Sequence, residues 1–180
     1  KNKNLEKDVR IAVVGKYFGT GDFTLADSYI SVIEAIKHAS LYNNVRPALD
    51  WVDSEEFEKK PAALKKLEKY DGIIVPGGFG HRGVEGIIRA IEFARNKKIP
   101  YLGLCYGMQL ATIEFLRNVV DKPEANTVEI DPETKDPVIY INPIQQKNMR
   151  DNRYGGTMRL GAYDCILEKD CLGKLAKDGE

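Results

Sequence analysis

The sequence has 180 residues, 43% of them hydrophobic and 30% charged, which is typical of one globular domain with its own core. Basic and acidic residues number 27 each, so the formal net charge is zero. This balance argues against a nucleic-acid or anionic-membrane surface as the main partner, because such surfaces are usually bound by a basic excess. Three scattered cysteines do not suggest a disulfide framework and favour a reduced, cytoplasmic setting. No apolar run approaches the length of a membrane span.

Strands and helices are predicted to alternate through the first two thirds of the chain. Residues 1–8 are charged, and we expect them to be the end of a linker that leads into a domain over residues 9–180. The apolar run Val9–Gly15 predicts a buried strand, and Thr24 with Asp27 matches a capping box that opens a helix. Further strands are predicted at 45–53, 72–75 and 101–104, and further helices at 61–70, 84–97 and 107–118.

This alternation predicts a mostly parallel sheet that is covered by helices on both faces. Pro47 favours an edge position, or a late start, for the strand at 45–53. After Asp121 the pattern changes, and "TVEI", "DPVIYI" and "YDCILEK" are predicted to be short strands, antiparallel or at a sheet edge.

The first candidate motif is Gly103-Leu104-Cys105-Tyr106-Gly107, at the junction of a predicted strand and a predicted helix. In a strand–turn–helix elbow a nucleophile stands exposed on a strained turn, and flanking glycines are needed because larger side chains would collide. The positive end of the helix that follows stabilises a thiolate. The alternative is a buried structural cysteine, but the spacing favours Cys105 as a nucleophile.

The second motif, Pro76-Gly77-Gly78-Phe79-Gly80, also follows a strand. Ligands of open α/β sheets gather outside the carboxyl ends of the strands. Glycines at that edge let backbone N–H groups approach an anionic oxygen, so this loop and the Tyr106 N–H predict an oxyanion hole. A tight strand–helix turn is the alternative.

Two further glycine-containing segments were considered as binding loops: the role of one remains open, and a phosphate-binding role is excluded for the other. The Gly155–Gly161 loop, "GGTMRLG", is interpreted as a lid, an anion contact or a hairpin connection. Gly15-Lys16-Tyr17 does not match a phosphate-binding loop, because the upstream glycine spacing and the following Ser or Thr are absent.

A cysteine nucleophile needs a general base, which is normally histidine. The sequence has two histidines. His38 lies well along the first predicted helix and is interpreted as a surface or packing residue. His81 follows the glycine-rich turn on the correct rim of the sheet, but we expect that loop to offer backbone N–H groups instead of a base.

Together these motifs resemble the class I glutamine amidotransferase family, in the form of the CTP synthase amidotransferase domains. The resemblance rests on "LADSYISVIEAIKHA", "DGIIVPGGFGHRGVEG", "PYLGLCYGMQLATIEFLRNV" and "GGTMRLG", and it extends from about Val9 to Gly161. It implies a flavodoxin-like open, mostly parallel sheet with helices on both faces and a short antiparallel C-terminal region.

The resemblance also implies a reaction. Cys105 would attack the carboxamide of glutamine, release ammonia and form a glutamyl thioester that water hydrolyses. Ammonia would pass to a synthetase domain that converts UTP to CTP with ATP. The implied oxyanion and substrate-binding residues are Gly78, Tyr106, Gly107, Met108, Gln109 and Glu129, with Glu129 on the glutamine α-amino group. The implied region for GTP as an effector comprises Phe79, Arg82, Thr157 and Arg159.

Further expectations follow from the same resemblance. The domain itself would bind no metal or cofactor, Mg and ATP would belong to the synthetase domain, and the full-length family forms homo-tetramers. Tyr106 stands where the family usually has an aliphatic residue. The triad histidine and glutamate lie in a C-terminal segment without counterpart here, so we expect an incomplete domain with little or no glutaminase activity of its own. The alternatives are a catalytically silent glutamine-binding or regulatory module of the same fold, and a DJ-1-like stress protein with a cysteine elbow.

Overall fold

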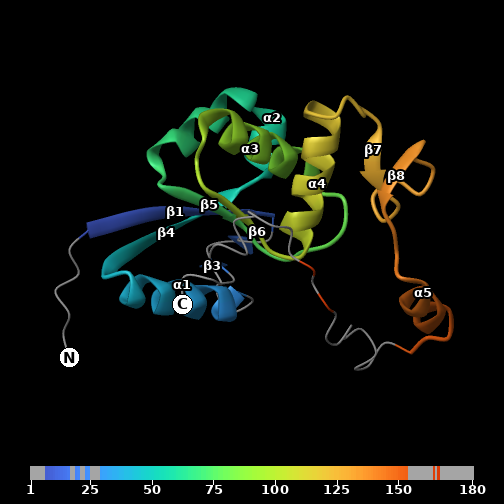
Figure 1. Cartoon of the computed structure of the whole chain (residues 1–180), viewed down its shortest axis with the longest axis horizontal. Helices are drawn as coiled ribbons and strands as arrows, with labels where there is room; N and C mark the ends of the chain where they lie inside the picture. Colours follow the sequence, from blue (N-terminus) through green and yellow to red (C-terminus); the bar gives the residue numbers. More distant parts are fainter. Residues whose placement is uncertain are drawn as a thin grey trace. The chain divides into compact units, whose positions relative to one another are not determined.

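The computed structural model describes residues 7–16, 19–20, 23–24, 29–153, 164 and 166 (Figure 1). The chain divides into two compact units, with the boundary after Tyr140. The Gly155–Gly161 loop and the predicted "YDCILEK" strand lie wholly or largely outside the described residues. None of the described helices is both long enough and apolar enough to cross a bilayer.

The first unit is built on a four-stranded parallel sheet with the strand order β4-β1-β5-β6. Its strands are β1 (Lys7–Gly15), β4 (Val45–Asp53), β5 (Gly72–Val75) and β6 (Tyr101–Gly103). Strand β1 lies in the interior of the sheet, where Ala12, Val13 and Val14 are fully buried, as its apolar run predicts. Strand β4 is an edge strand, which accommodates Pro47 because an edge needs fewer backbone donors.

Helices cover both faces of this sheet, so the mostly parallel, flavodoxin-like prediction is confirmed. Figure 1 shows α1 on one face and α2, α3 and α4 on the other. The bounds are α1 (Ile30–Tyr42), α2 (Glu55–Lys59), the 3-10 helix η2 (Pro61–Lys69), α3 (Val84–Lys97) and α4 (Tyr106–Asn118). The five-residue helix α2 was not predicted.

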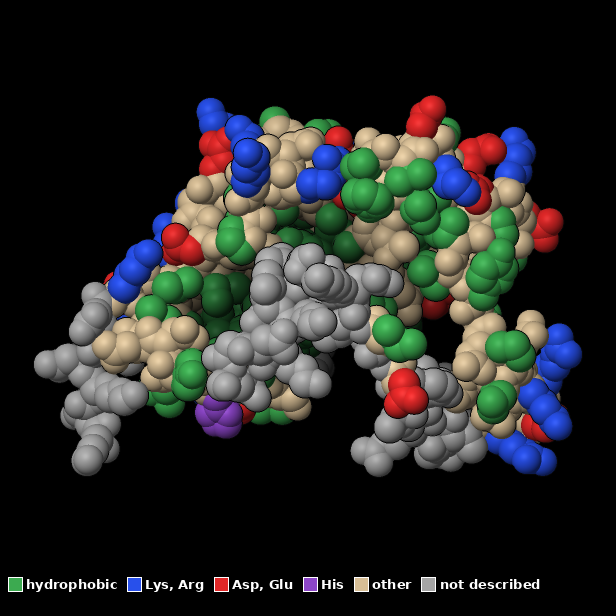
Figure 2. All heavy atoms as spheres, viewed as in Figure 1, with side chains coloured by type: hydrophobic (Ala, Val, Ile, Leu, Met, Phe, Trp, Pro, Cys, Tyr) green, Lys and Arg blue, Asp and Glu red, His purple; other side chains and the backbone are tan. Residues whose placement is uncertain are grey.

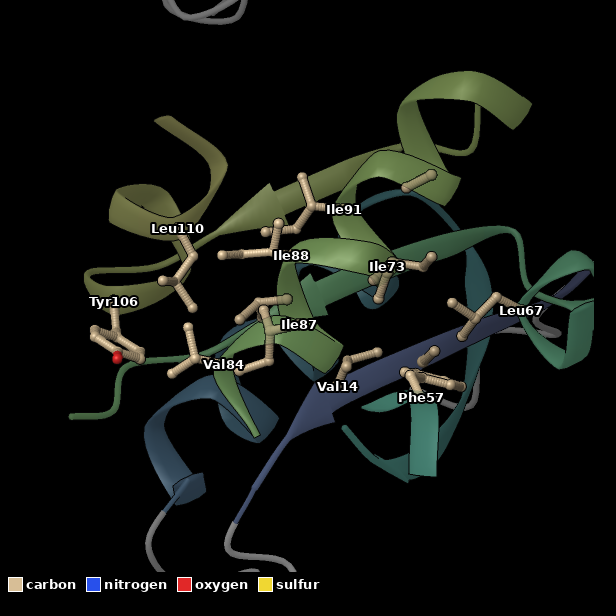
Figure 3. Close-up of a cluster of buried hydrophobic side chains, with 14 of the residues drawn as sticks. Val14, Phe57, Leu67, Ile73, Val84, Ile87, Ile88, Ile91, Tyr106 and Leu110 are labelled. Atoms are coloured by element: carbon tan, nitrogen blue, oxygen red, sulfur yellow. The ribbon is translucent and has the colours of Figure 1, made fainter. Parts of the chain in front are cut away.

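The core lies between the sheet and helix α3. Four residues of α3, Ile87, Ile88, Ile91 and Ala94, are buried on its inward face. They pack with residues of β5 and α4, including Ile73 and Leu110 (Figure 3). Each large aliphatic side chain buried in this way contributes about 1.5–3 kcal/mol of hydrophobic stabilisation.

A partly buried ion pair connects α3 and α4. Arg95 on α3 donates to Glu114 on α4 at 2.7 Å, and the Glu114 side chain is 2% exposed. The Asn118 amide also donates to Glu114 at 3.1 Å, so this carboxylate is well supplied with donors, as a buried charge requires.

The predicted start of the first helix was wrong. Helix α1 begins at Ile30 with Tyr29 as its N-cap, and no side chain caps it. Thr24 instead lies in β3 (Phe23–Thr24), which pairs antiparallel with β2 (Gly19–Thr20). Because this pairing places Thr24 in extended backbone, it cannot cap a helix that starts six residues later.

The predicted antiparallel pairing after Asp121 was also wrong. Strands β7 (Ala125–Thr127) and β8 (Asp136–Ile139) form a separate two-stranded sheet and pair in parallel. The connection folds back on itself, since the Thr134 hydroxyl donates to the Glu124 carbonyl at 3.0 Å. This contact brings the start of β8 beside the start of β7, so both strands run in the same direction.

The second unit contains α5 (Pro143–Arg150), which was not predicted. Its start is nevertheless visible in the sequence. The Asn142 side chain accepts a hydrogen bond from the Ile144 N–H at 2.9 Å, and Pro143 occupies the first helical position, where no N–H is required.

An apolar hollow of 570 Å³ lies between α1 and the sheet. Aliphatic residues such as Val32, Ile74 and Leu102 form most of its lining, and no predicted site residue takes part. Over the helical layer above it, acidic and basic side chains lie interspersed on the visible face (Figure 2). The candidate polar groups gather instead at the carboxyl ends of the strands, where open α/β sheets bind their ligands.

Candidate active site at the carboxyl ends of the strands

Cys105 lies on the turn between β6 and α4, and its side chain is exposed. Its backbone has φ 51° and ψ −101°, which is a strained conformation for any residue with a Cβ. The flanking glycines are required by contact. A Cβ on Gly103 would lie 2.6 Å from the Gly107 backbone, and one on Gly107 would lie 2.2 Å from the Val75 carbonyl oxygen. The turn therefore presents the thiol to solvent in the manner of a nucleophile elbow.

Two hydrogen bonds hold this elbow against the sheet. The Leu104 N–H donates to the Val75 carbonyl at 2.9 Å, and the Tyr101 hydroxyl donates to the Gly107 carbonyl at 2.8 Å. Burial raises the pKa of Tyr101 well above 10.0, and the nearby Glu114 carboxylate acts in the same direction. Tyr101 therefore remains a protonated donor at neutral pH, and its link to the elbow was missed in the sequence.

The glycine-rich loop after β5 lies directly beside the elbow. Strands β5 and β6 are neighbours, with Val75 opposite Gly103, so the turns that follow them leave the sheet side by side. A Cβ on Gly77 would be 3.7 Å from the Cβ of Cys105, and one on Gly78 would be 3.6 Å from the Tyr106 ring. Only backbone stands between the loop and the thiol, which is the approach that an oxyanion hole needs.

Glu129 reaches the same loop from the turn after β7. Its Oε1 accepts a hydrogen bond from the Gly80 N–H at 2.8 Å, and the side chain remains exposed. The structure thus brings together the elbow, the glycine-rich loop and a carboxylate that lies 24 positions beyond Cys105 in the sequence. A carboxylate there can bind a substrate ammonium group.

Lys16, at the carboxyl end of β1, was missed as a site residue. It is 6% exposed, and its Nζ donates to the Gly80 carbonyl at 2.8 Å. Burial lowers the pKa of Lys16 below 10.5; Glu129 counteracts this, and Arg82 adds to it. The available signal was its position directly after a buried strand, at the edge of the sheet where ligands bind.

The remaining predicted residues lie around this centre. Met108, in the first turn of α4, is 57% exposed, whereas Gln109 is half-buried and its N–H donates to the Cys105 carbonyl at 3.1 Å. Phe79 is 71% exposed. Arg82 donates to the Lys16 carbonyl at 3.0 Å and pairs with Glu55 at 2.8 Å. Two predicted effector residues fall outside the described residues, namely Thr157 and Arg159.

Neither histidine is joined to the thiol. Within the described part of the chain, no hydrogen bond links His38 or His81 to Cys105. His38 is exposed on α1, and His81 is exposed on the loop before α3. The described residues contain no group of three or more His, Cys, Asp or Glu side chains able to hold a metal ion.

The fold and the site define an open-sheet α/β protein with a cysteine elbow beside a glycine-rich loop. The sequence profile of the "Glutamine amidotransferase class-I" family matches residues 24–178. The chain belongs to the class I glutamine amidotransferase family.

Two similar curated proteins are CTP synthases. The CTP synthase of Caldanaerobacter subterraneus is 52% identical over 179 residues, which cover 99% of this chain and 32% of that protein. The CTP synthase of Thermococcus gammatolerans is 48% identical over 174 residues, covering 97% of this chain and 31% of that protein. This chain therefore spans about a third of the length of these curated relatives.

A solved structure is also similar. It is the "Trypanosoma brucei CTPS - glutaminase domain with bound acivicin", which is 44% identical to this chain. The TM-score is 0.67, and the match covers 74% of this chain and 50% of that chain.

Proposed function

We propose that this chain is the glutamine-hydrolysing domain of a CTP synthase. The observation that carries the proposal is the exposed Cys105 thiol on a strained turn, with Gly77 beside its Cβ, Gly78 beside the Tyr106 ring and Glu129 bound to the same loop. The relatives named CTP synthase, and the similar glutaminase domain, support the same substrate.

In this reaction the Cys105 thiolate attacks the side-chain carbonyl carbon of glutamine. The carbonyl π electrons move onto oxygen, and N–H groups of Gly78 and Tyr106 stabilise the oxyanion. When the carbonyl reforms, the C–N bond breaks, and the nitrogen takes a proton from water and leaves as ammonia. Water then attacks the thioester carbon, the C–S bond breaks, and glutamate and the Cys105 thiolate are released while the two protons of that water pass to solvent.

Glu129 orients the substrate in this scheme. Its carboxylate would pair with the α-ammonium group of glutamine, while Gly107, Met108 and Gln109 line the side-chain pocket. A charged hydrogen bond of this kind contributes about 1.5–3 kcal/mol, so it selects an amino acid over a simple amide.

The proposal also includes the reaction of the longer protein of which this domain would be a part. Ammonia would pass to a synthetase domain that aminates ATP-activated UTP, with Mg bound there, in a cytoplasmic homo-tetramer. GTP would act as an effector near Phe79 and Arg82. These two side chains are exposed beside the glycine-rich loop, which suits an effector that adjusts the loop.

Covalent labelling tests the proposal. The full chain is incubated with acivicin, and peptide mass spectrometry locates the adduct. We expect labelling of Cys105 and protection by glutamine, with Cys165 and Cys171 as internal controls. Equal labelling of all three cysteines, or no protection by glutamine, would refute the proposal.

The role of Glu129 has a matched test. Glu129→Gln should weaken protection by glutamine about 10- to 100-fold, the equivalent of one charged hydrogen bond. Glu133→Gln is the control, because Glu133 is an exposed carboxylate in the same connection between β7 and β8. Unchanged protection in Glu129→Gln would contradict the assigned contact.

A further inference from the structure

Two buried donors converge on one carbonyl of the glycine-rich loop. The Lys16 ammonium donates to the Gly80 carbonyl at 2.8 Å, and the Tyr106 hydroxyl donates to the same oxygen. The two donors also contact each other, since the Lys16 Nζ lies 5.0 Å from the centre of the Tyr106 ring. Lys16 is 6% exposed and Tyr106 is 2% exposed, so neither donor is a solvated surface group.

The same glycine is held on its other side. Its N–H donates to Glu129 at 2.8 Å, and its φ is 74°, a conformation that glycine adopts easily. Gly80 is therefore fixed by three side chains, from the end of β1, from the start of α4 and from the turn after β7. In the sequence these side chains lie 64, 26 and 49 positions from Gly80.

Burying a lysine in this way is unfavourable, because the ammonium group loses its water. Lysine is rarely fully buried without a partner. Here a carbonyl and a ring face take the place of water, and Glu129 lies close enough to favour the charged form. Such an arrangement is expected where a loop must hold one position, since the loop's own glycines restrict its backbone very little.

The ring and the hydroxyl of Tyr106 have separate roles. Its ring packs at one end of the hydrophobic cluster beside Val84 and Leu110, and its hydroxyl is the only polar atom on that ring (Figure 3). An aliphatic residue at this position would fill the core equally well but could not donate to Gly80. The tyrosine therefore adds a link between the elbow and the loop.

The geometry points to Lys16 and the Tyr106 side chain as positioning residues. Acting through the Gly80 carbonyl, they hold the Gly77–Gly80 loop where its N–H groups face the oxygen of a substrate bound at Cys105. This inference rests on the proposed glutaminase function, and it assigns a role to two side chains that contact no reacting atom. Because Glu129 holds the same glycine, the loop position and the binding of the substrate ammonium are coupled.

The test compares two reagents on Cys105. Acivicin requires the substrate site, whereas iodoacetamide requires only an accessible thiolate. Tyr106→Phe removes one hydroxyl and keeps the ring, and Lys16→Met removes the charge and keeps most of the stem. Each variant should label with acivicin about 10- to 100-fold more slowly, because small misplacements of an oxyanion site are costly. Labelling with iodoacetamide should stay at the wild-type rate.

Tyr70→Phe is the matched control. The Tyr70 hydroxyl also makes a partly buried hydrogen bond, to Asp50 at 2.8 Å. Tyr70 precedes β5, however, and so lies at the amino end of that strand, away from the site. It should label with both reagents like the wild type. The double variant of Lys16 and Tyr106 should lose less than the product of the two single losses, since both donors serve one acceptor.

Hydrogen exchange of the Gly77–Arg82 segment gives a readout that needs no chemistry at Cys105. Exchange should be faster in Tyr106→Phe and Lys16→Met and unchanged in Tyr70→Phe. Wild-type exchange and acivicin rates in the two variants would overturn the inference, and so would equal slowing with both reagents, which indicates general damage to the elbow. If acivicin does not label the wild type while hydrogen exchange responds as expected, the proposed glutaminase function is wrong, but Lys16 and Tyr106 still hold the loop in position.

Discussion

Relieving the backbone strain at Cys105 should stabilise the protein. The residue adopts φ 51° and ψ −101°, a region that costs a residue with a Cβ about 1–3 kcal/mol. Glycine removes this cost but loses about 0.4–1 kcal/mol through the greater freedom of its unfolded chain. We therefore expect Cys105→Gly to be about 1 kcal/mol more stable than Cys105→Ala, which equals about 2–4 °C in melting temperature for a protein of this size.

The comparison of these two variants isolates the backbone contribution, because both lack the thiol and the side chain is exposed. Urea and thermal unfolding of the full chain provide the measurement. Lys98→Gly against Lys98→Ala is the reference pair, since Lys98 has ordinary left-handed backbone at the end of α3 (φ 55°, ψ 35°) and lies outside the site. If the Lys98 pair differs in favour of glycine and the Cys105 pair does not, the elbow is unstrained and the reasoning fails.

Three more predictions concern stability. Gly107→Ala should lower the free energy of unfolding in urea by about 3 kcal/mol, because its Cβ would lie 2.2 Å from the Val75 carbonyl oxygen. Gly72→Ala, whose Cβ would have its nearest contact at 3.7 Å, should be nearly neutral. Similar losses in the two variants would contradict this. Glu114→Gln should cost about 1–2 kcal/mol, since the buried side chain loses its charged hydrogen bonds with the partly exposed Arg95, and a loss below about 0.5 kcal/mol would show that the pair contributes little. Burial lowers the pKa of Lys16 in the folded protein, so as the pH rises toward 10.5 the folded protein releases the Lys16 proton before the unfolded chain does. The wild type should therefore gain stability relative to Lys16→Met over that range, and a constant difference would exclude this linkage.

The regular part of the fold was readable from local patterns. Apolar runs predicted the parallel strands, and the spacing of apolar residues predicted helix α3 at Val84–Lys97 with its buried face. These predictions succeeded because a strand buried on both faces, or an amphipathic helix, is recorded in consecutive residues. The predictions of where α1 begins and of how β7 and β8 pair were wrong because each feature depends on a contact with a segment some residues away.

The candidate site divides in the same way. The elbow at Cys105 and the glycine-rich loop were visible in the sequence, since each is a short motif at the end of a strand. Lys16 was not, although it lies next to Gly15, because nothing around it shows that its ammonium reaches a carbonyl 64 positions away. Tyr101 was missed for a similar reason, as a strand residue whose hydroxyl holds the elbow.

The amino-acid sequence was enough to establish the strand and helix pattern, the turn that carries the thiol and the family to which the chain belongs. The groups around Gly80 could be identified only from the folded chain, because the parallel sheet brings the ends of β1, β5 and β6 to one edge. Local motifs record how a segment bends, whereas the burial of an ammonium and a tyrosine hydroxyl around one carbonyl is a property of three segments packed together.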